Sequence, residues 1–296
     1  MFSSTQQRKK VQTASLSIMS NIFLIVLKVI AGILSGSVSI ISEAIHSGMD
    51  LMAAFIAFFA VRISGMPPDK NHPYGHGKFE NVSGVIEALL IFVAAGWIIY
   101  EAIHKLINPT LPEQLGIGTL VMGISAIVNY FIANRLYKVG KETDSVALEA
   151  DGLHLKTDVY TSLGVALGLS LIWITGIKIL DPIIAMLVAG MILQKSYVLL
   201  KKAFSPLLDT PLPEKEIKII EQTINNHLTS GMSYHMLRSR KAGAKRYVDL
   251  HLEVPGIISV NESHKLCDLI EDEIEHKLDN IEVYIHIEPS DTTNTE

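Results

Sequence analysis

The sequence predicts a membrane protein with a six-transmembrane-helix, all-α bundle followed by a small α+β domain. Three observations support this fold class. Hydrophobic residues make up 49% of the 296-residue chain, and the mean hydropathy of +0.34 is high for a water-soluble protein. The apolar residues of the first part gather into six long segments. Residues 209–296 carry 17 acidic and 9 basic side chains, which leaves 13 acidic and 16 basic residues in 1–208.

Each apolar segment is long enough to cross a bilayer, which takes about 20 residues in a helix. Proline motifs mark some of the ends: Asn108-Pro109 and Leu111-Pro112 follow the third segment, and Asp181-Pro182 begins the sixth. We therefore predict a transmembrane domain over 1–208. Its predicted spans are Val11–Leu34, Val38–Ile63, Val82–Ile107, Leu115–Val139, Ser145–Thr175 and Ile179–Leu200.

Basic residues lie mainly at one set of segment ends. The positive-inside rule then places the N-terminus, the loops after the second and fourth segments, and the C-terminal part in the cytoplasm. The chain is expected to be a multi-pass protein of a bacterial or archaeal plasma membrane, in contact with lipid. The residues on the predicted cytoplasmic side are Arg8, Lys9, Lys10, Arg62, Lys70, Lys78, Arg135, Lys138, Lys141, Lys201 and Lys202.

The C-terminal part, 209–290, is predicted to be a cytoplasmic domain of order αββαβ, of the ferredoxin-like or metallochaperone-like kind. An amphipathic helix spans about 213–228, strands lie at Met236–Lys241 and Arg246–Val254, a second helix begins at Ser259, and Ile281–Glu288 is the third strand. This order suits an open sheet with helices on one side. Residues 291–296 are polar and are predicted to be disordered.

Two HxxxD motifs lie inside predicted spans: His46 with Asp50, and His154 with Asp158. The i, i+4 spacing places each imidazole and its carboxylate on one face of a helix. An ionisable group at the bilayer centre costs about 2.5–3.5 kcal/mol, so it needs a partner or a function. Two imidazoles and two carboxylates provide the four ligands of a tetrahedral Zn²⁺ ion. The motifs therefore predict a metal site within the membrane.

Two further groups of candidate ligands lie outside the predicted spans. Asp69, His72 and His76 fall within eight residues of a loop that contains Pro and Gly, and with water they could complete a metal site. The second group combines residues on or just before the predicted strands with one early in a predicted helix, and a bridging carboxylate would let it bind two metals. Its members are His235, His251, His264, His286 and Glu288.

With these motifs the chain resembles the cation diffusion facilitator family of proton-coupled divalent-metal exporters. The resemblance rests on the paired HxxxD motifs, the Asp-x-x-His-x-x-x-His loop that runs into Gly-His-Gly-Lys, and the αββαβ domain, and it covers nearly the whole chain. It implies a homodimer whose cytoplasmic domains meet, a transport site at the two motifs, and metal sites in the loop and the tail. It also implies a salt bridge between Lys78 and Asp209 that links the protomers.

His46 stands where some bacterial members with broader selectivity have Asp, which resembles the zinc-selective branch and disfavours manganese. We therefore predict a Zn²⁺/H⁺ antiporter, not an enzyme, that exports metal from the cytoplasm by alternating access. Protons are the counter-ion, and Zn²⁺ bound in the tail regulates transport. A transporter selective for Mn²⁺, Fe²⁺, Co²⁺ or Cd²⁺ is the main alternative within the family.

Other interpretations compete with this one. The HxxxD pairs could act as hydrogen-bond clamps between spans, and Lys78 and Asp209 could be unrelated surface charges. A membrane-anchored metal sensor would need only the tail sites. An intramembrane metalloprotease would need the HExxH signature, which the sequence lacks. The acidic C-terminal part excludes nucleic acid as a partner. Lys28 and Glu87 are lone charges in predicted spans, with no expected role beyond helix pairing or lining a water cavity.

Overall fold

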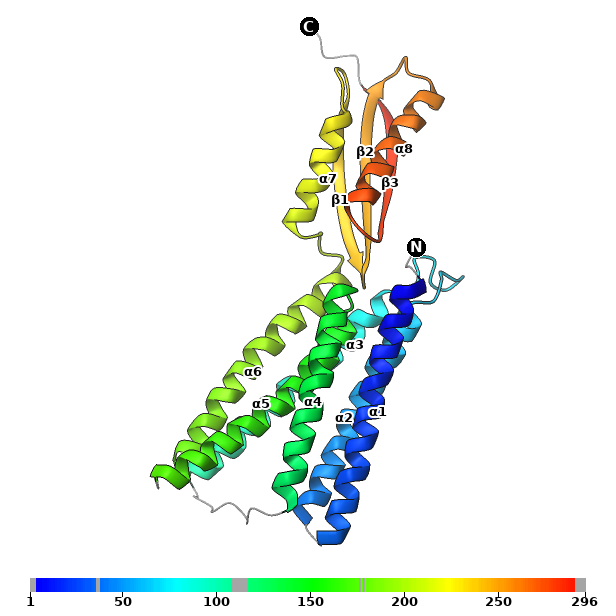
Figure 1. Cartoon of the computed structure of the whole chain (residues 1–296). Helices are drawn as coiled ribbons and strands as arrows, with labels where there is room; N and C mark the ends of the chain where they lie inside the picture. The colour runs from blue at the N-terminus through cyan, green and yellow to red at the C-terminus, as the bar shows by residue number, and fades with distance from the viewer. Residues whose placement is uncertain (1–3, 36–37, 108–116, 176, 178, 291–296) are drawn as a thin grey trace. The chain divides into compact units, whose positions relative to one another are not determined.

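The computed structural model describes residues 4–35, 38–107, 117–175, 177 and 179–290 (Figure 1). The chain forms two compact units, Ser3–Phe204 and Ser205–Glu296. Residues 291–296, which the sequence predicts to be disordered, lie outside the described residues.

Within the described ranges, the first unit contains six long helices. Over the described residues, five of them, α1 to α4 and α6, contain spans long and apolar enough to cross a membrane. The predicted bundle is confirmed as a helical transmembrane region. The helices are α1 (Ser4–Ser35), α2 (Val38–Ser64), α3 (Lys78–Ile107), α4 (Ile117–Glu142), α5 (Val146–Thr175) and α6 (Leu180–Phe204).

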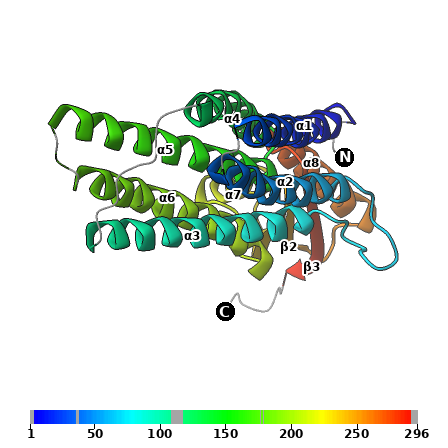
Figure 2. The ribbon, with the colours of Figure 1, turned by 90° about the horizontal axis from the view of Figure 1, so that it is seen from below.

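Small residues allow the helices of the bundle to pack closely. Helix α3 runs beside α6, as Figure 2 shows, and α4 packs along α5. An added Cβ at Gly84 of α3 would lie 2.7 Å from the Cγ1 of Val146 and 3.0 Å from the Cβ of Ala203. At Gly152 of α5 it would lie 3.0 Å from the backbone nitrogen of Tyr137. In the absence of a hydrophobic driving force between helices in lipid, such close approach supplies the packing energy.

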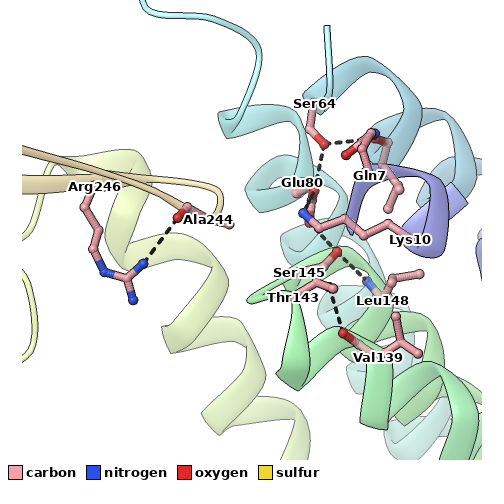
Figure 3. A network of polar contacts seen from close by, with 11 residues as sticks. Gln7, Lys10, Ser64, Glu80, Val139, Thr143, Ser145, Leu148, Ala244 and Arg246 are labelled. Atoms are coloured by element: carbon pink, nitrogen blue, oxygen red, sulfur yellow. Dashed lines mark hydrogen bonds and ion pairs between the residues drawn. The ribbon is translucent and has the colours of Figure 1, made fainter. Parts of the chain in front are cut away.

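A buried polar cluster joins four helices where α2 ends and α3 begins (Figure 3). Lys10 of α1 donates to Glu80 of α3 at 2.9 Å, and both side chains are 1% exposed. Ser64 of α2 donates to the same Oε1 at 2.7 Å, and Ser145, next to the start of α5, donates to Oε2. Lys10, which the charge pattern of the sequence assigns to the cytoplasmic surface, is instead buried in this cluster, which we call the Glu80 cluster.

The second unit has the predicted αββαβ order. It begins with a short 3₁₀ helix, Ser205–Leu208, and continues with α7 (Glu214–His227), β1 (Ser233–Ala242), β2 (Lys245–Pro255), α8 (Val260–Lys277) and β3 (Ile281–Ser290). The sheet order is β1-β2-β3, with β1 antiparallel and β3 parallel to β2. A capping box between Ser259 and Glu262 fixes the start of α8.

Both helices of this unit cover one face of the sheet. Alternate residues of β2 from Val248 to Val254 are buried, and they form one core with apolar residues of α7 and α8 such as Ile220 and Ile270. The intervening residues, His251 among them, point to the opposite face. In β1 the register shifts between His235 and Arg238, which is the irregularity of a β-bulge.

Candidate metal centres

The two HxxxD motifs come together inside the bundle, as the sequence predicts. Helix α2 provides His46 and Asp50, and α5 provides His154 and Asp158. Ligand atoms of His46, Asp50 and Asp158 all lie within 4.8 Å of one another. The Nε2 of His46 is 4.0 Å from the Oδ1 of Asp50. Three of the four predicted ligands thus form one compact group.

The fourth predicted ligand, His154, lies at the edge of this group. Its Nε2 is 3.2 Å from the Oδ1 of Asp50. Two ligands of a tetrahedral Zn²⁺ ion, each at about 2.0–2.1 Å from the metal, are about 3.3 Å apart, so this spacing suits a shared ion. The Nδ1 of His154 faces a third helix, where the Oε2 of Glu87 is 3.9 Å away.

A cavity of about 250 Å³ opens beside the group. It holds the side chains of His46, Asp50 and Asp158, and Lys28 of α1 reaches its wall, where the ammonium donates to the Oγ of Ser47 at 2.7 Å. Oxygen-bearing side chains of α4 and α5, which the sequence motifs do not indicate, also line the cavity. They are Ser125, Asn129, Thr161 and Ser162. The i, i+4 spacing of Ser125 and Asn129 could have indicated in the sequence that their polar side chains share one face of α4.

The donor set suits a divalent transition metal. Imidazole nitrogen and carboxylate oxygen are the ligands that Zn²⁺ and its neighbours take in proteins. Asp50 is buried, and the Oδ2 of Asp158 is buried with no hydrogen-bond partner among the described residues. Such a carboxylate oxygen requires a partner, and a cation in the adjacent cavity would provide one.

The loop between α2 and α3 brings its three predicted ligands together. Asp69 Oδ1 is 3.3 Å from the Nδ1 of His72, and Asp69 Oδ2 is 3.3 Å from the Nε2 of His76. The backbone N–H of His72 donates to the Asp69 carboxylate at 2.7 Å and keeps the pKa of that group below its ordinary value. The carboxylate is therefore ionised at neutral pH and faces two imidazoles, a set of ligand atoms that could hold a metal ion.

The open face of the cytoplasmic sheet gathers a second set around Glu288. Its carboxylate is 2.9 Å from the Nδ1 of His251, 3.4 Å from the Nε2 of His235 and 3.5 Å from the Nε2 of His286. The three strands position these residues, because His235 pairs with His251 and His251 pairs with His286 across the sheet. Glu253 was missed: it lies two residues after His251 on the same face, and its Oε1 is 3.3 Å from His235.

Not every predicted ligand joins these groups. His264 is 73% exposed on α8 and lies 3.6 Å from Asp268 of the same helix. Since α8 covers the other face of the sheet, the structure keeps His264 apart from His251 within this unit. Asp209 lies 3.6 Å from the Nη1 of Arg240. Lys78 belongs to the other unit, and its pairing with Asp209 stays a prediction.

Two family models match this chain almost from end to end. Residues 14–208 match the cation efflux transmembrane domain, and residues 212–290 match the cytoplasmic domain of cation efflux proteins. The chain belongs to the cation diffusion facilitator family. It is therefore a multi-pass membrane protein of a cation efflux transporter family rather than of an enzyme family.

Curated relatives span the same length as this facilitator. An uncharacterized transporter of Synechocystis is 36% identical over 263 residues, covering 89% of this chain and 85% of the relative. The cation-efflux pump FieF of Shewanella oneidensis is 30% identical over 276 residues, covering 92% of each chain. The metal-bound C-terminal domain of the CzcD transporter from Thermotoga maritima is 29% identical, with a TM-score of 0.24, and covers 28% of this chain and 100% of that domain.

Proposed function

We propose that this facilitator exports Zn²⁺ from the cytoplasm in exchange for protons, by alternating access. The observation that carries the proposal is the group of His46, Asp50 and Asp158 inside the bundle, with His154 beside it and a polar cavity next to it. Four N and O ligands on two facing helices provide a site that a small shift of α2 against α5 would open or close.

The ligand set favours Zn²⁺ over Mn²⁺. Two of the four ligands are imidazoles, whereas sites for manganese are richer in oxygen ligands. The spacing between His154 and Asp50 is also that of a tetrahedral zinc site. Fe²⁺, Co²⁺ and Cd²⁺ accept similar ligands, so His46 sets a preference among metals rather than an absolute choice.

Proton exchange follows from the same four side chains. Each ligand must offer a free lone pair to bind metal, and a proton occupies that lone pair in competition with the ion. The ordinary pKa of histidine, about 6.5, lies between the pH of a cytoplasm and that of a more acidic exterior. Metal would therefore leave as protons bind on the outside, and the protonated site would return inward.

The loop and the tail are proposed to regulate this cycle. Glu288 has three imidazole partners on an exposed face of the sheet, and Glu253 adds a second carboxylate beside His235, where cytoplasmic metal can reach the group. The matched cytoplasmic domain favours a homodimer. Metal bound on this face would stabilise one arrangement of the two domains and bias transport.

The test is metal flux into proteoliposomes with an imposed pH gradient. Zn²⁺, Mn²⁺, Fe²⁺ and Co²⁺ are compared for the wild type, for Asp158→Asn and for the control Asp279→Asn, which removes an exposed carboxylate in the tail. We expect gradient-dependent Zn²⁺ flux that Asp158→Asn abolishes and Asp279→Asn leaves intact. Flux of Mn²⁺ instead would overturn the selectivity argument. Metal binding without any flux would favour the membrane-anchored sensor.

A further inference from the structure

Helix α3 carries a carboxylate that the proposed cycle does not use. Glu87 is 0% exposed, and neither of its oxygens has a hydrogen-bond partner in the part of the chain that the structure describes. Its Oε2 is 3.9 Å from the Nδ1 of His154, and that nitrogen also has no hydrogen-bond partner there. Burial of a carboxylate without partners is costly. Three unsatisfied polar atoms that face one another therefore indicate an interaction that forms in another state of the site.

The ring of His154 lies between two carboxylates from different helices. Asp50 of α2 is 3.2 Å from Nε2, and Glu87 of α3 is 3.9 Å from Nδ1. A neutral imidazole has one N–H donor and one lone pair. If Nδ1 carries the hydrogen, it points at Glu87, and the lone pair of Nε2 is left for an ion next to Asp50. The opposite tautomer would direct an N–H at the ion.

We propose that Glu87 is a positioning residue for His154: it accepts the Nδ1–H and thereby directs Nε2 to the transported ion. The inference rests on the proposed function, because it concerns the same site. A hydrogen bond requires a donor–acceptor distance of about 2.7–3.2 Å, so the Glu87 side chain closes a gap of roughly 1 Å when metal binds. Loss of such an orienting partner typically costs about 10–100-fold in metal affinity.

Asp151 is the competing partner for His154. It lies three residues earlier on α5, is 1% exposed, and has one oxygen without a partner among the described residues. It moves with His154 because both belong to the same helix, whereas Glu87 is held on α3. The Oε2 of Glu87 lies 3.9 Å from the Nδ1 of the imidazole. Variants of both carboxylates separate the two assignments.

The experiment combines Zn²⁺ flux with ¹⁵N-histidine solid-state NMR on the full chain in proteoliposomes. The His154 signal is assigned by comparison with His154→Gln. In the Zn²⁺-loaded wild type we expect a metal-bound Nε2 and a protonated Nδ1. Glu87→Leu should raise the KM for Zn²⁺ about 10–100-fold and remove the fixed tautomer. Glu87→Gln keeps an acceptor oxygen and should stay close to the wild type, as should the control Glu101→Gln on the exposed part of the same helix.

Several results would overturn the assignment. The assignment is overturned if His154 of the wild type binds metal through Nδ1. This result needs no variant, so it holds even if Glu87→Leu folds poorly. An unchanged KM and His154 signal in Glu87→Leu would also overturn the assignment. If Asp151→Asn alone changed the tautomer, the role would belong to Asp151. A failure of the proposed function is detected by a different result, undiminished Zn²⁺ flux in Asp158→Asn. That result does not affect the measurement of the His154 tautomer.

Discussion

Replacement of Glu80 by Gln tests how the buried charges at one end of the bundle are held. The carboxylate accepts hydrogen bonds from Lys10, Ser64 and Ser145, and it is 1% exposed. Glutamine preserves the volume but removes the negative charge beside a buried ammonium. Breaking a buried ion pair by removing one partner costs about 3–5 kcal/mol. We expect Glu80→Gln to lower the free energy of unfolding by that amount.

Replacement of the other partner, Lys10→Met, should lower the free energy of unfolding by less. Glu80 then keeps two hydroxyl donors, and methionine fills the space of the lysine stem. The double variant, Lys10→Met with Glu80→Gln, contains neither charge and should be more stable than Glu80→Gln alone, because a buried pair replaced by neutral groups is often tolerated.

Equilibrium unfolding of the purified protein in mixed micelles, by titration with sodium dodecyl sulfate, measures these differences. The expected order of stability is wild type, then Lys10→Met and the double variant, then Glu80→Gln. A stability of Glu80→Gln within about 1 kcal/mol of the wild type, the range of an exposed ion pair, would contradict a buried pair. Simple addition of the two single effects in the double variant would also contradict it, since residues in direct contact should couple.

Three further outcomes follow from packing, burial and the tail cluster. Gly152→Ala should destabilise the bundle by about 1–3 kcal/mol in the same unfolding assay, because its Cβ would lie 3.0 Å from a backbone nitrogen of α4, whereas Gly96→Ala, with nothing within 4 Å, should not. Burial raises the pKa of the Cys267 thiol from 9.0 to about 11, so its thiolate forms only at higher pH. At about pH 8, alkylation followed by mass spectrometry should be about a hundredfold slower than for an unburied thiol, and an equal rate would contradict the burial. Zn²⁺ should protect the amides of β3 from hydrogen exchange in the wild type but not in His251→Ala, and equal protection in both would argue against a site there.

Hydropathy predicted which segments are helical but not where those helices end. Helix α1 begins at Ser4 rather than near Val11, and α3 begins at Lys78 rather than near Val82. In both cases the helix continues through charged residues beyond the apolar run. Hydropathy reports the apolar thickness of a span, whereas backbone hydrogen bonding extends a helix for as long as the next residues permit.

Some residues of the candidate sites could likewise be predicted from the sequence, and others could not. The HxxxD pairs and the Asp69 loop could be recognised because their ligands are neighbours in sequence, at spacings that a helix or a tight loop converts into proximity. Contacts between distant helices could not be recognised. The burial of Lys10 against Glu80 and the approach of Glu87 to His154 depend on how α3 crosses α1 and α5. Strand register likewise placed Glu253 in the tail group.

The two buried carboxylates of α3 are related by the geometry of one helix. Glu80 and Glu87 are seven residues apart, which is about two turns and about 10 Å along one face. The Glu80 cluster fixes the height and rotation of α3 at one end, and we therefore expect it to set the position of Glu87 opposite His154. Glu80→Gln should then raise the KM for Zn²⁺ in the flux assay, and much less so when Glu87 is already Leu. Substitutions this far apart usually act additively, so a fully additive pair would show that the two carboxylates act separately.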